Sequence, residues 1–461
     1  MKKILTASIL LTLIVSSGAF AASARWNALG NDHRFIIDTT NYTVYPGRIT
    51  LFGNALFIIP VPTGDIKEAY DERYFADNGI VSGALLNVKN MTLAFHYNLA
   101  TDGTKNLNKA LAGFAGQNDS LAGLSLRTFP DLFWGMKVGN ISLGARVAVA
   151  KDSSEDSATV KEKPITISGV EVGTETGPIE KITTSAKSID LSLGATVYKT
   201  PAGDLDLGLR AGVQSFSDDN PNNPKDHTTV ESQGGTDMAF DARLNKPIGE
   251  TNTLVSFLNL NKGENPSAKY DEITAPNVIE ASYQKGELGL GFRNAIKDKG
   301  TFIAGVVGSY VATKSKTTTT IVVMEEKVVK SRTKKELPET KDTTMGATVL
   351  AGYERPLTKW LIIRGGANVK FSTLDDEIAV SKKTEQYPPG KTELEVKTED
   401  LVRNKKSANV DYYYNMGFRT IVFGGWIIDV VLSRNSIHRG PYFLTGASGI
   451  WATNVCVTYA F

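Results

Sequence analysis

The sequence predicts an all-β fold: a transmembrane antiparallel β-barrel of about 14–16 strands, with an N-terminal plug in its lumen. Segments of about ten residues alternate between apolar and polar side chains along the chain, which is the repeat of a half-buried strand. Short turns alternate with long polar connections. The chain ends in WATNVCVTYAF, an alternating segment whose last residue is aromatic. These three features together are typical of outer-membrane barrels.

Residues 1–21 have the pattern of a secretory signal peptide. Lys2 and Lys3 precede an apolar run from Ile4 to Val15, and Ala19-Phe20-Ala21 is a cleavage motif, with cleavage as late as residue 24 as the alternative. A membrane anchor is the competing interpretation. The run is shorter than the roughly 20 apolar residues that a spanning helix needs, which favours the signal peptide.

Charge and cysteine content restrict the partners. Without Lys2 and Lys3, the 51 basic residues become 49 and equal the 49 acidic ones. A neutral chain argues against nucleic acid as a partner, because phosphate binding requires an excess of positive charge. Cys456 is the single cysteine, so there is no internal disulfide.

The segment 22–47 does not alternate and precedes the first predicted strand. Its low charge and its apolar Phe35-Ile36-Ile37 favour a plug inside the lumen over a flexible periplasmic tail, since disordered tails are usually polar and charged. The candidate plug residues are Arg34, Asp38, Asn41 and Tyr42.

The barrel is predicted over 48–461. Sixteen segments are read as strands, and three of them (48–59, 252–262 and 301–313) alternate poorly, so fourteen is the alternative to sixteen. Bacterial single-chain barrels have an even number of strands. Long extracellular loops are predicted at 151–187, 217–235, 261–286, 314–342 and 373–407.

Alternation assigns a polar inner face. In the stretch ANVDYYYNMGFR, for example, Val410 and Tyr412 face lipid while Asp411 and Arg419 face inwards. The mixed signs fit either a wet channel of weak selectivity or an interior closed by ion pairs, because unpaired buried charges are costly. The predicted lumen-lining residues are His96, Arg146, Asp190, Asp206, Arg210, Asp237, Asp241, Arg243, Arg293, Arg364, Lys370, Asp411, Arg419 and Asp429.

The last strand has to close against the first, because a strand edge cannot remain unpaired in lipid. Its apolar face consists of Val455, Val457, Tyr459 and Phe461. This face resembles the C-terminal signal that barrel-assembly machinery reads in outer-membrane proteins, so that machinery is an expected partner during biogenesis.

The N-terminal residues also resemble a known family. Ala28-Leu29-Gly30-Asn31, Asp38 and Tyr45-Pro46-Gly47, together with the hairpin at 129–147, are similar to the start of the long-chain fatty-acid transporters and of the related type IX secretion barrel. Here Tyr-Pro-Gly replaces the family's Asn-Pro-Ala. The resemblance implies a lumen plug and transfers no substrate residue.

Catalysis and metal binding find no support in the sequence. The four histidines are His33, His96, His227 and His438, and no Ser, His and acid lie at a spacing typical of a hydrolase. No clustered Cys/His set and no phosphate-binding glycine loop is present. We therefore expect no enzyme activity, no metal and no cofactor.

The expected function is that of a porin-like channel or transporter in the outer membrane of a Gram-negative cell envelope. Its solute is expected to be small, hydrophobic solutes included. The alternative is a closed barrel that anchors a surface protein or serves as a scaffold in secretion. The expected partners are therefore outer-membrane lipid and either the solute or a surface protein.

Overall fold

The structure, a computed structural model, describes residues 25, 28–29, 32–36, 39–61, 79–99, 101–112, 124–158, 163–167, 170–175, 180–219, 230–270, 278–296, 299–325, 328–336, 339–386, 395–422, 426–432 and 452–460. The predicted signal peptide lies outside these residues, as do Asp38 and Phe461.

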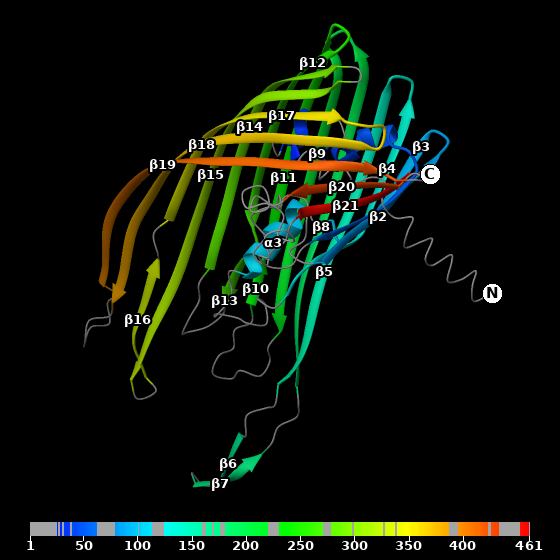
Figure 1. The fold of residues 1–461 in the computed structure, drawn as a ribbon. Coiled ribbons are helices and arrows are strands. Elements are labelled where there is room, and N and C mark those ends of the chain that lie inside the picture. The colour runs from blue at the N-terminus through cyan, green and yellow to red at the C-terminus, as the bar shows by residue number, and fades with distance from the viewer. Residues whose placement is uncertain are drawn as a thin grey trace, which may run out of the picture.

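Sixteen strands among the described residues form a closed antiparallel ring (Figure 1), which confirms the predicted fold class. Each strand pairs with the next, and the last pairs with the first, with Ala55 opposite Ala460. The ring runs through β1 (Ala55–Val61), β2 (Gly79–Val88), β3 (Met91–Tyr97), β4 (Arg127–Val138), β5 (Ile141–Ala158), β8 (Glu180–Thr200), β9 (Gly203–Asp219), β11 (Gly235–Ile248), β12 (Asn252–Asn265), β14 (Val278–Ile296), β15 (Gly300–Glu325), β17 (Glu339–Pro356), β18 (Leu361–Gln386), β19 (Glu395–Ile421), β20 (Trp426–Leu432) and β21 (Ala452–Ala460).

Five short strands extend the molecule beyond the ring. β10 (Val230–Gln233), β13 (Ser267–Tyr270) and β16 (Val328–Glu336) join the large sheet, whereas β6 (Lys163–Ile167) and β7 (Val170–Glu175) form a separate hairpin. No helix in the described part of the chain is long and apolar enough to cross a membrane.

Strands continue into the ranges predicted as loops. β5 runs to Ala158, β15 to Glu325 and β18 to Gln386. These extensions are rich in polar residues and lack the regular alternation that marks a strand in lipid, yet their ladders continue by ordinary cross-strand pairing. The first predicted strand also differs: residues 46–51 form a 3₁₀ helix, and β1 begins only at Ala55.

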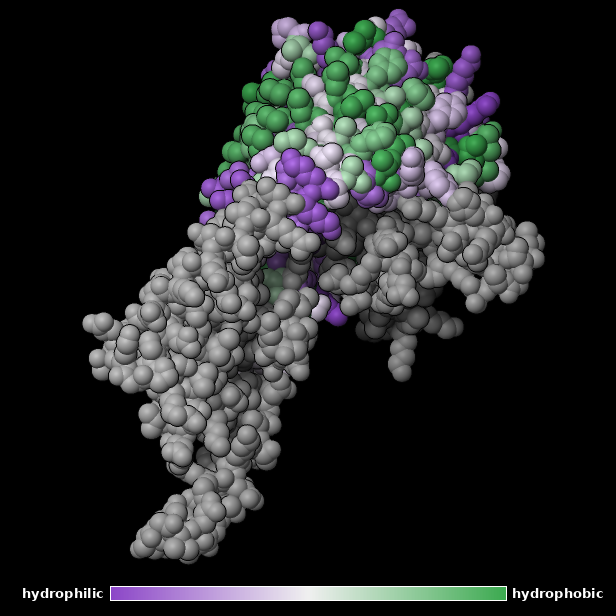
Figure 2. Space-filling model, turned by 90° about the vertical axis from the view of Figure 1, so that its left-hand side faces the viewer, coloured by the Kyte–Doolittle hydropathy of each residue, from purple (hydrophilic) through white to green (hydrophobic). Residues whose placement is uncertain are grey.

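Side chains on the ring separate by face as the alternation predicts. Outward positions such as Leu193, Leu288 and Met238 are apolar and more than 60% exposed. Figure 2 shows an apolar band on the outer surface with hydrophilic residues at its edges. Such a band around a closed ring is the lipid-facing belt of a transmembrane barrel.

Two parts of the chain fill the lumen (Figure 1). The N-terminal segment, here the described residues from 25 to 54, contains the 3₁₀ helices η1 (His33–Phe35), η2 (Thr39–Thr43) and η3 (Pro46–Leu51). Helix α3 (Asp102–Ala112) belongs to the connection between β3 and β4 and packs against β8, β9, β11 and β12. The two chain ends of the ring, at Ala55 and Ala460, lie at the short-turn rim, which is the edge that carries tight turns such as that at Gly139 (φ 60°). α3 enters from the opposite, long-loop rim.

Candidate functional site

A row of glycines crosses the inner wall beneath the N-terminal segment. Gly135, Gly144, Gly194 and Gly208 stand opposite one another on β4, β5, β8 and β9. A Cβ atom on Gly144 would lie 2.2 Å from the carbonyl carbon of Pro46, and one on Gly194 would lie 2.6 Å from Pro46 Cδ. Any larger side chain would displace the segment, so this glycine row is the surface on which the segment is seated.

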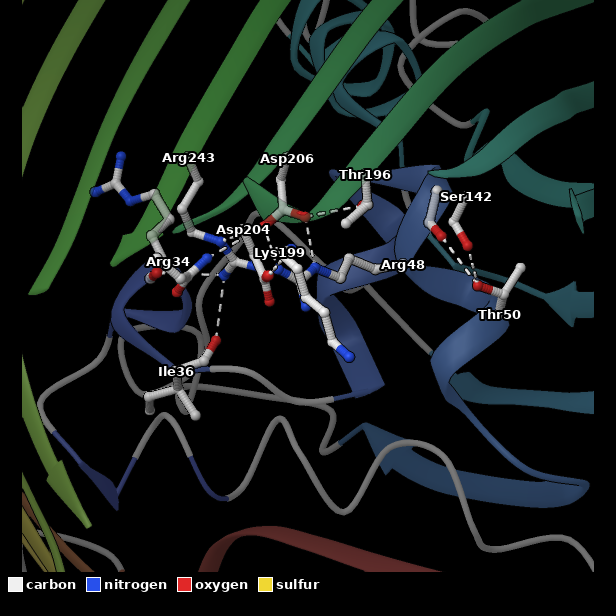
Figure 3. Close-up of polar contacts among 12 residues, drawn as sticks. Arg34, Ile36, Arg48, Thr50, Ser142, Thr196, Lys199, Asp204, Asp206 and Arg243 are labelled. Carbon is white, nitrogen blue, oxygen red and sulfur yellow. Dashed lines mark hydrogen bonds and ion pairs between the residues drawn. The ribbon is translucent and has the colours of Figure 1, made fainter. Parts of the chain in front are cut away.

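Asp206 on β9 joins the segment to the wall (Figure 3). Its buried carboxylate accepts hydrogen bonds from Arg48 Nε at 2.5 Å, from Arg243 Nε at 2.9 Å and from Thr196 Oγ1 at 2.8 Å. Arg243 also donates from Nη1 to the carbonyl oxygens of Arg34 and Ile36, each at 3.3 Å. The Asp206 carboxylate therefore binds two arginines: Arg48, which belongs to the segment, and Arg243, which holds the segment's backbone.

A second buried contact joins Tyr42 to β3 and β4. The Tyr42 hydroxyl lies 2.7 Å from His96 Nε2, and His96 Nδ1 lies 3.2 Å from Asp131, which accepts two hydrogen bonds from Arg146 at 2.8 and 3.0 Å. Burial raises the pKa of the Tyr42 hydroxyl well above its usual value; the charge of Asp131 adds to this rise and that of Arg146 opposes it. Tyr42 is therefore neutral over the physiological range.

Two further ion-pair groups tie the segment to the other side of the ring. Arg25 donates two hydrogen bonds to Glu354 on β17, at 3.0 and 2.9 Å. Arg34 pairs with Asp32 at 2.8 Å and with Glu287 on β14 at 2.7 Å. Buried charges of this kind require their partners, so the segment is held by paired arginines on both sides of the lumen.

Both charged and apolar contacts hold α3. Asp102 pairs with Arg210, Asn106 Nδ2 donates to the Tyr283 hydroxyl at 2.9 Å, and Leu107 and Leu111 lie in an apolar cluster with wall residues. Burial alone would raise the pKa of Asp102. The Arg210 guanidinium, followed by Lys105, outweighs burial and holds that pKa well below its usual range.

A polar cavity of ≈ 130 Å³ lies between α3 and the N-terminal segment. Thr43 and Arg34 line it from the segment, Thr101 and Asp102 from the α3 connection, and the wall contributes residues that include Arg146, Arg210, Asp241, Lys285 and Glu287. A water needs about 10–15 Å³ of such volume and polar partners, so the cavity has room for several waters or one small polar molecule.

The structure describes all fourteen residues that were predicted to line the lumen. Lys370 is exposed and stands opposite Asp411 in the strand register. Nine are buried: His96, Arg146, Asp190, Asp206, Asp237, Asp241, Arg243, Arg364 and Asp429. Arg210, Arg293, Asp411 and Arg419 are partly buried.

The other predicted sites are located in part. Of the plug candidates, Arg34, Asn41 and Tyr42 are buried inside the ring, and Asp38 lies outside the described residues. Val455, Val457 and Tyr459 lie on β21, where the Tyr459 ring is 5.1 Å from that of Trp426.

Some of the residues that hold the lumen contents were not predicted. Arg48 fell in a range read as strand. The alternation around Asp131 is broken by a bulge between Thr128 and Asp131, which hid its inward position. Glu287 and Glu354 lie on predicted strands at inward positions, so a stricter reading of the alternation would have found them.

Comparisons with known proteins assign no family to the chain. No family model and no curated protein matches the chain. Among solved structures, the ferric-catecholate import receptor Fiu from E. coli K12 has 6% identity and a TM-score of 0.36, with 89% of this chain and 82% of that chain covered. The ferric yersiniabactin uptake receptor FyuA from Yersinia pestis has 8% identity and a TM-score of 0.35, with 83% and 68% covered. The FrpB iron transporter from Neisseria meningitidis has 8% identity and a TM-score of 0.29, with 87% and 83% covered.

These neighbours are iron receptors and transporters rather than members of the fatty-acid transporter family that the N-terminal residues resemble. Likeness at such identity and TM-score assigns no substrate. The closed ring and its apolar outer band identify the fold: the chain is a transmembrane β-barrel of the outer-membrane type.

Proposed function

We propose that the chain is an outer-membrane channel or transporter for a small polar solute, with residues 1–21 as its export signal and 22–47 as its lumen plug. The observation that carries this proposal is the polar cavity between α3 and the N-terminal segment. A scaffold barrel with a fully packed interior would have no use for such a cavity.

The layout of the rims supports an orientation. Outer-membrane barrels have short periplasmic turns and long extracellular loops. With the short-turn rim in the periplasm, the N-terminal segment closes the periplasmic side and α3 closes the outer side. A solute then reaches the cavity by displacement of α3 and leaves it by displacement of the segment.

The lining favours a polar solute over the hydrophobic one that the sequence left open. Arg34, Arg210 and Lys285 face the cavity together with Asp241 and Glu287, while Val44 and Leu99 are the apolar residues of its lining. A hydrophobic solute would remove water from these charged groups without replacing its hydrogen bonds, which is unfavourable. A solute with its own donors and acceptors would replace them.

The contacts also suggest which element moves first. The segment is held by buried arginine pairs and by the glycine row, whereas the described contacts of α3 are the ion pair of Asp102 with Arg210, hydrogen bonds and two leucines. We expect α3 to be the more easily displaced of the two, in line with the lower local stability of gating elements.

Conductance in planar bilayers tests the proposal. Four proteins are compared: the full mature chain, a chain lacking 24–43, a chain in which residues 101–112 are replaced by a short Gly/Ser linker, and the double variant. The expected order of step size is lowest for the full chain and highest for the double variant. Deletion of the separate β6–β7 hairpin, 163–175, is the matched control and should leave the steps unchanged. Silence in all four proteins would refute the channel.

A specific observation supports the second candidate, a scaffold for a surface protein. β15, β18 and β19 contain 26, 26 and 27 residues, far more than the roughly 9–11 that span a membrane. The excess length extends the sheet beyond the apolar band and offers backbone and side chains to a partner. Trimming 318–336 should release a co-purifying surface protein if this role is real, and no such partner should be found if it is not.

A further inference from the structure

Side chains that line the polar cavity stand in two rows on the inner wall. In the first row, the strand register aligns Arg210 on β9, Asn261 on β12 and Lys285 on β14, with Ala239 on β11 between the first two. Arg210, Asn261 and Lys285 all line the cavity. The charged groups of this row are both positive, and it is called the cationic row below.

The second row lies two residues closer to the short-turn rim on each strand. The register aligns Asp241 on β11, Asn259 on β12 and Glu287 on β14, with Gly208 on β9 beside Asp241. Asp241, Asn259 and Glu287 also line the cavity, and they form the acidic row. The wall of the cavity is therefore positive along one row and negative along the next.

Polar atoms of both rows are buried without a hydrogen-bond partner among the described residues. Arg210 Nε and Asp241 Oδ2 lie 3.5 Å apart, which is longer than an ordinary hydrogen bond, and neither atom forms one. Asn261 Oδ1 is also buried without a hydrogen-bond partner. Buried polar atoms of this kind are costly, so the cavity favours a molecule that carries both donors and acceptors.

The opposite signs of the rows restrict the net charge of that molecule. An anion would be attracted to Arg210 and Lys285 and repelled by Asp241 and Glu287, and a cation would meet the reverse arrangement. A molecule without net charge that carries one charge of each sign is attracted to both rows.

The distance between the rows fits charges that are close together. The carboxylate oxygen and the ammonium nitrogen of an α-amino acid are about 3 Å apart, as its bond lengths require. The 3.5 Å between Arg210 Nε and Asp241 Oδ2 is similar, so one amino acid can accept a hydrogen bond from the first atom and donate one to the second.

We infer that the cavity binds a small zwitterion, such as free glycine or another short α-amino acid. Its carboxylate accepts hydrogen bonds from Arg210 and Lys285, and its ammonium group donates to Asp241. The cavity volume of ≈ 130 Å³ exceeds that of a molecule of five non-hydrogen atoms, which is smaller than four waters at about 30 Å³ each. This choice of solute rests on the proposed function, because it names the class of polar molecule that the channel takes.

A neutral polyol is the competing solute. Its hydroxyl groups also supply donors and acceptors. Hydrogen bonds between charged groups, however, are roughly twice as strong as those between neutral groups. The zwitterion forms such bonds with both rows, so we expect the cavity to prefer it.

Isothermal calorimetry on the full mature barrel in detergent at neutral pH tests the inference. Free glycine is compared with acetate, which lacks the ammonium group, with methylammonium, which lacks the carboxylate, and with glycerol, which lacks both charges. Glycine should bind with a millimolar Kd, because so few atoms make contact. Each of the other three should bind at least about tenfold more weakly.

Two variants test the two rows separately. Asp241→Asn should weaken glycine binding at least about tenfold and should bind acetate no more weakly than wild type, because only a negative charge is removed. Lys285→Gln should also weaken glycine binding and should bind methylammonium no more weakly than wild type. A general loss of structure would weaken every compound alike, so these opposite patterns are specific to the charges.

Asp375→Asn is the matched control, since its partner is the exposed Lys406 and neither residue lines the cavity. It should bind glycine like wild type. If Asp241→Asn fails to fold, Lys285→Gln remains, because the Lys285 side chain is 30% exposed and its loss is better tolerated.

Binding and conductance together separate this inference from the proposed function. Absence of glycine binding in wild type, or equal binding of glycine and glycerol, would overturn the zwitterion site even if the barrel conducts. Glycine binding that both row variants weaken, in a barrel that stays silent in bilayers, would support the site and refute the channel.

Discussion

Arg48 Nε lies 2.5 Å from Asp206 Oδ1, and neither side chain is more than 2% exposed. The two residues are 158 positions apart in the sequence. Their contact joins the N-terminal segment to the middle of the barrel wall, and Arg243 shares the same carboxylate. The N-terminal segment closes the short-turn side of the lumen, and this closure, here called the seal, therefore depends largely on one aspartate.

Asp206→Asn should strongly destabilise the plugged barrel. The substitution leaves the guanidinium groups of Arg48 and Arg243 buried beside an amide, and breaking a buried charge pair in this way costs about 3–5 kcal/mol. Chemical unfolding in detergent measures the change, and bilayer recordings should show more frequent opening. Asp375→Asn is the control: it removes the exposed ion pair of Asp375 with Lys406 on β18 and β19 and should change stability by about 1 kcal/mol or less. Equal effects of the two variants would contradict this account of the seal.

Gly144→Val should displace the N-terminal segment without removing any charged contact. The new Cβ would lie 2.2 Å from the backbone of Pro46, a distance that the two chains cannot share. We expect larger conductance and faster proteolysis of the segment. At Gly308 the nearest atom to an added Cβ is 3.9 Å away, so Gly308→Val serves as the control and should behave like wild type. Retention of the segment in Gly144→Val would show that the glycine row is not its seat.

The closure by α3 should depend on pH only in strong acid. Because the closed state lowers the pKa of Asp102, its stabilisation is complete above the usual carboxyl range near 4 and is lost as pH falls through the lowered value. Channel opening should therefore be constant from pH 5 to pH 8 and rise only at lower pH. Asp102→Asn should open more often than wild type from pH 5 to pH 8, and the difference should shrink in strong acid, where the wild-type carboxyl is protonated. A wild-type transition between pH 5 and pH 8 would contradict this assignment.

Alkaline pH should act on the opposite side of the lumen. Burial raises the pKa of Tyr42, so the folded state keeps this proton longer than an unfolded chain does, and the associated stability is present below pH 10 and lost above it. Tyr42→Phe removes the hydroxyl bonded to His96 and should cost about 1–3 kcal/mol. Tyr45 is buried as well, so the variant should lose one of the late tyrosinate signals in an ultraviolet pH titration. An unchanged titration would mean that the Tyr42 hydroxyl is not protected from ionisation.

The fold was predictable because lipid imposes a strict rule on each strand separately. Leu193 and Asp190, for example, show their faces through nothing more than the alternation around them. The contacts between side chains inside the lumen were less predictable, because a contact such as that of Arg48 with Asp206 depends on where distant strands lie in the ring. The glycine row illustrates the same limit: positions 135, 144, 194 and 208 have no regular spacing in sequence and align only through the strand register.

The polar strand extensions were hidden for a different physical reason. Outside the membrane, both faces of a strand ladder can be hydrated. A polar residue such as Glu155 or Lys382 is then as compatible with a strand as with a loop, and the sequence does not distinguish the two. Backbone pairing alone continues β5 and β18 there. Alternation of apolar and polar residues identifies a strand only where one of its faces is shielded from water.

The short link between η3 and β1 has a consequence for how the molecule is made. Only residues 52–54 separate the last turn of the N-terminal segment from the strand that pairs with β21. β1 is synthesised well before β21, so the two edges can pair only after both strands have been made. The segment is thus already at the opening when the edges join, and each molecule encloses its own N-terminal residues rather than those of a neighbour.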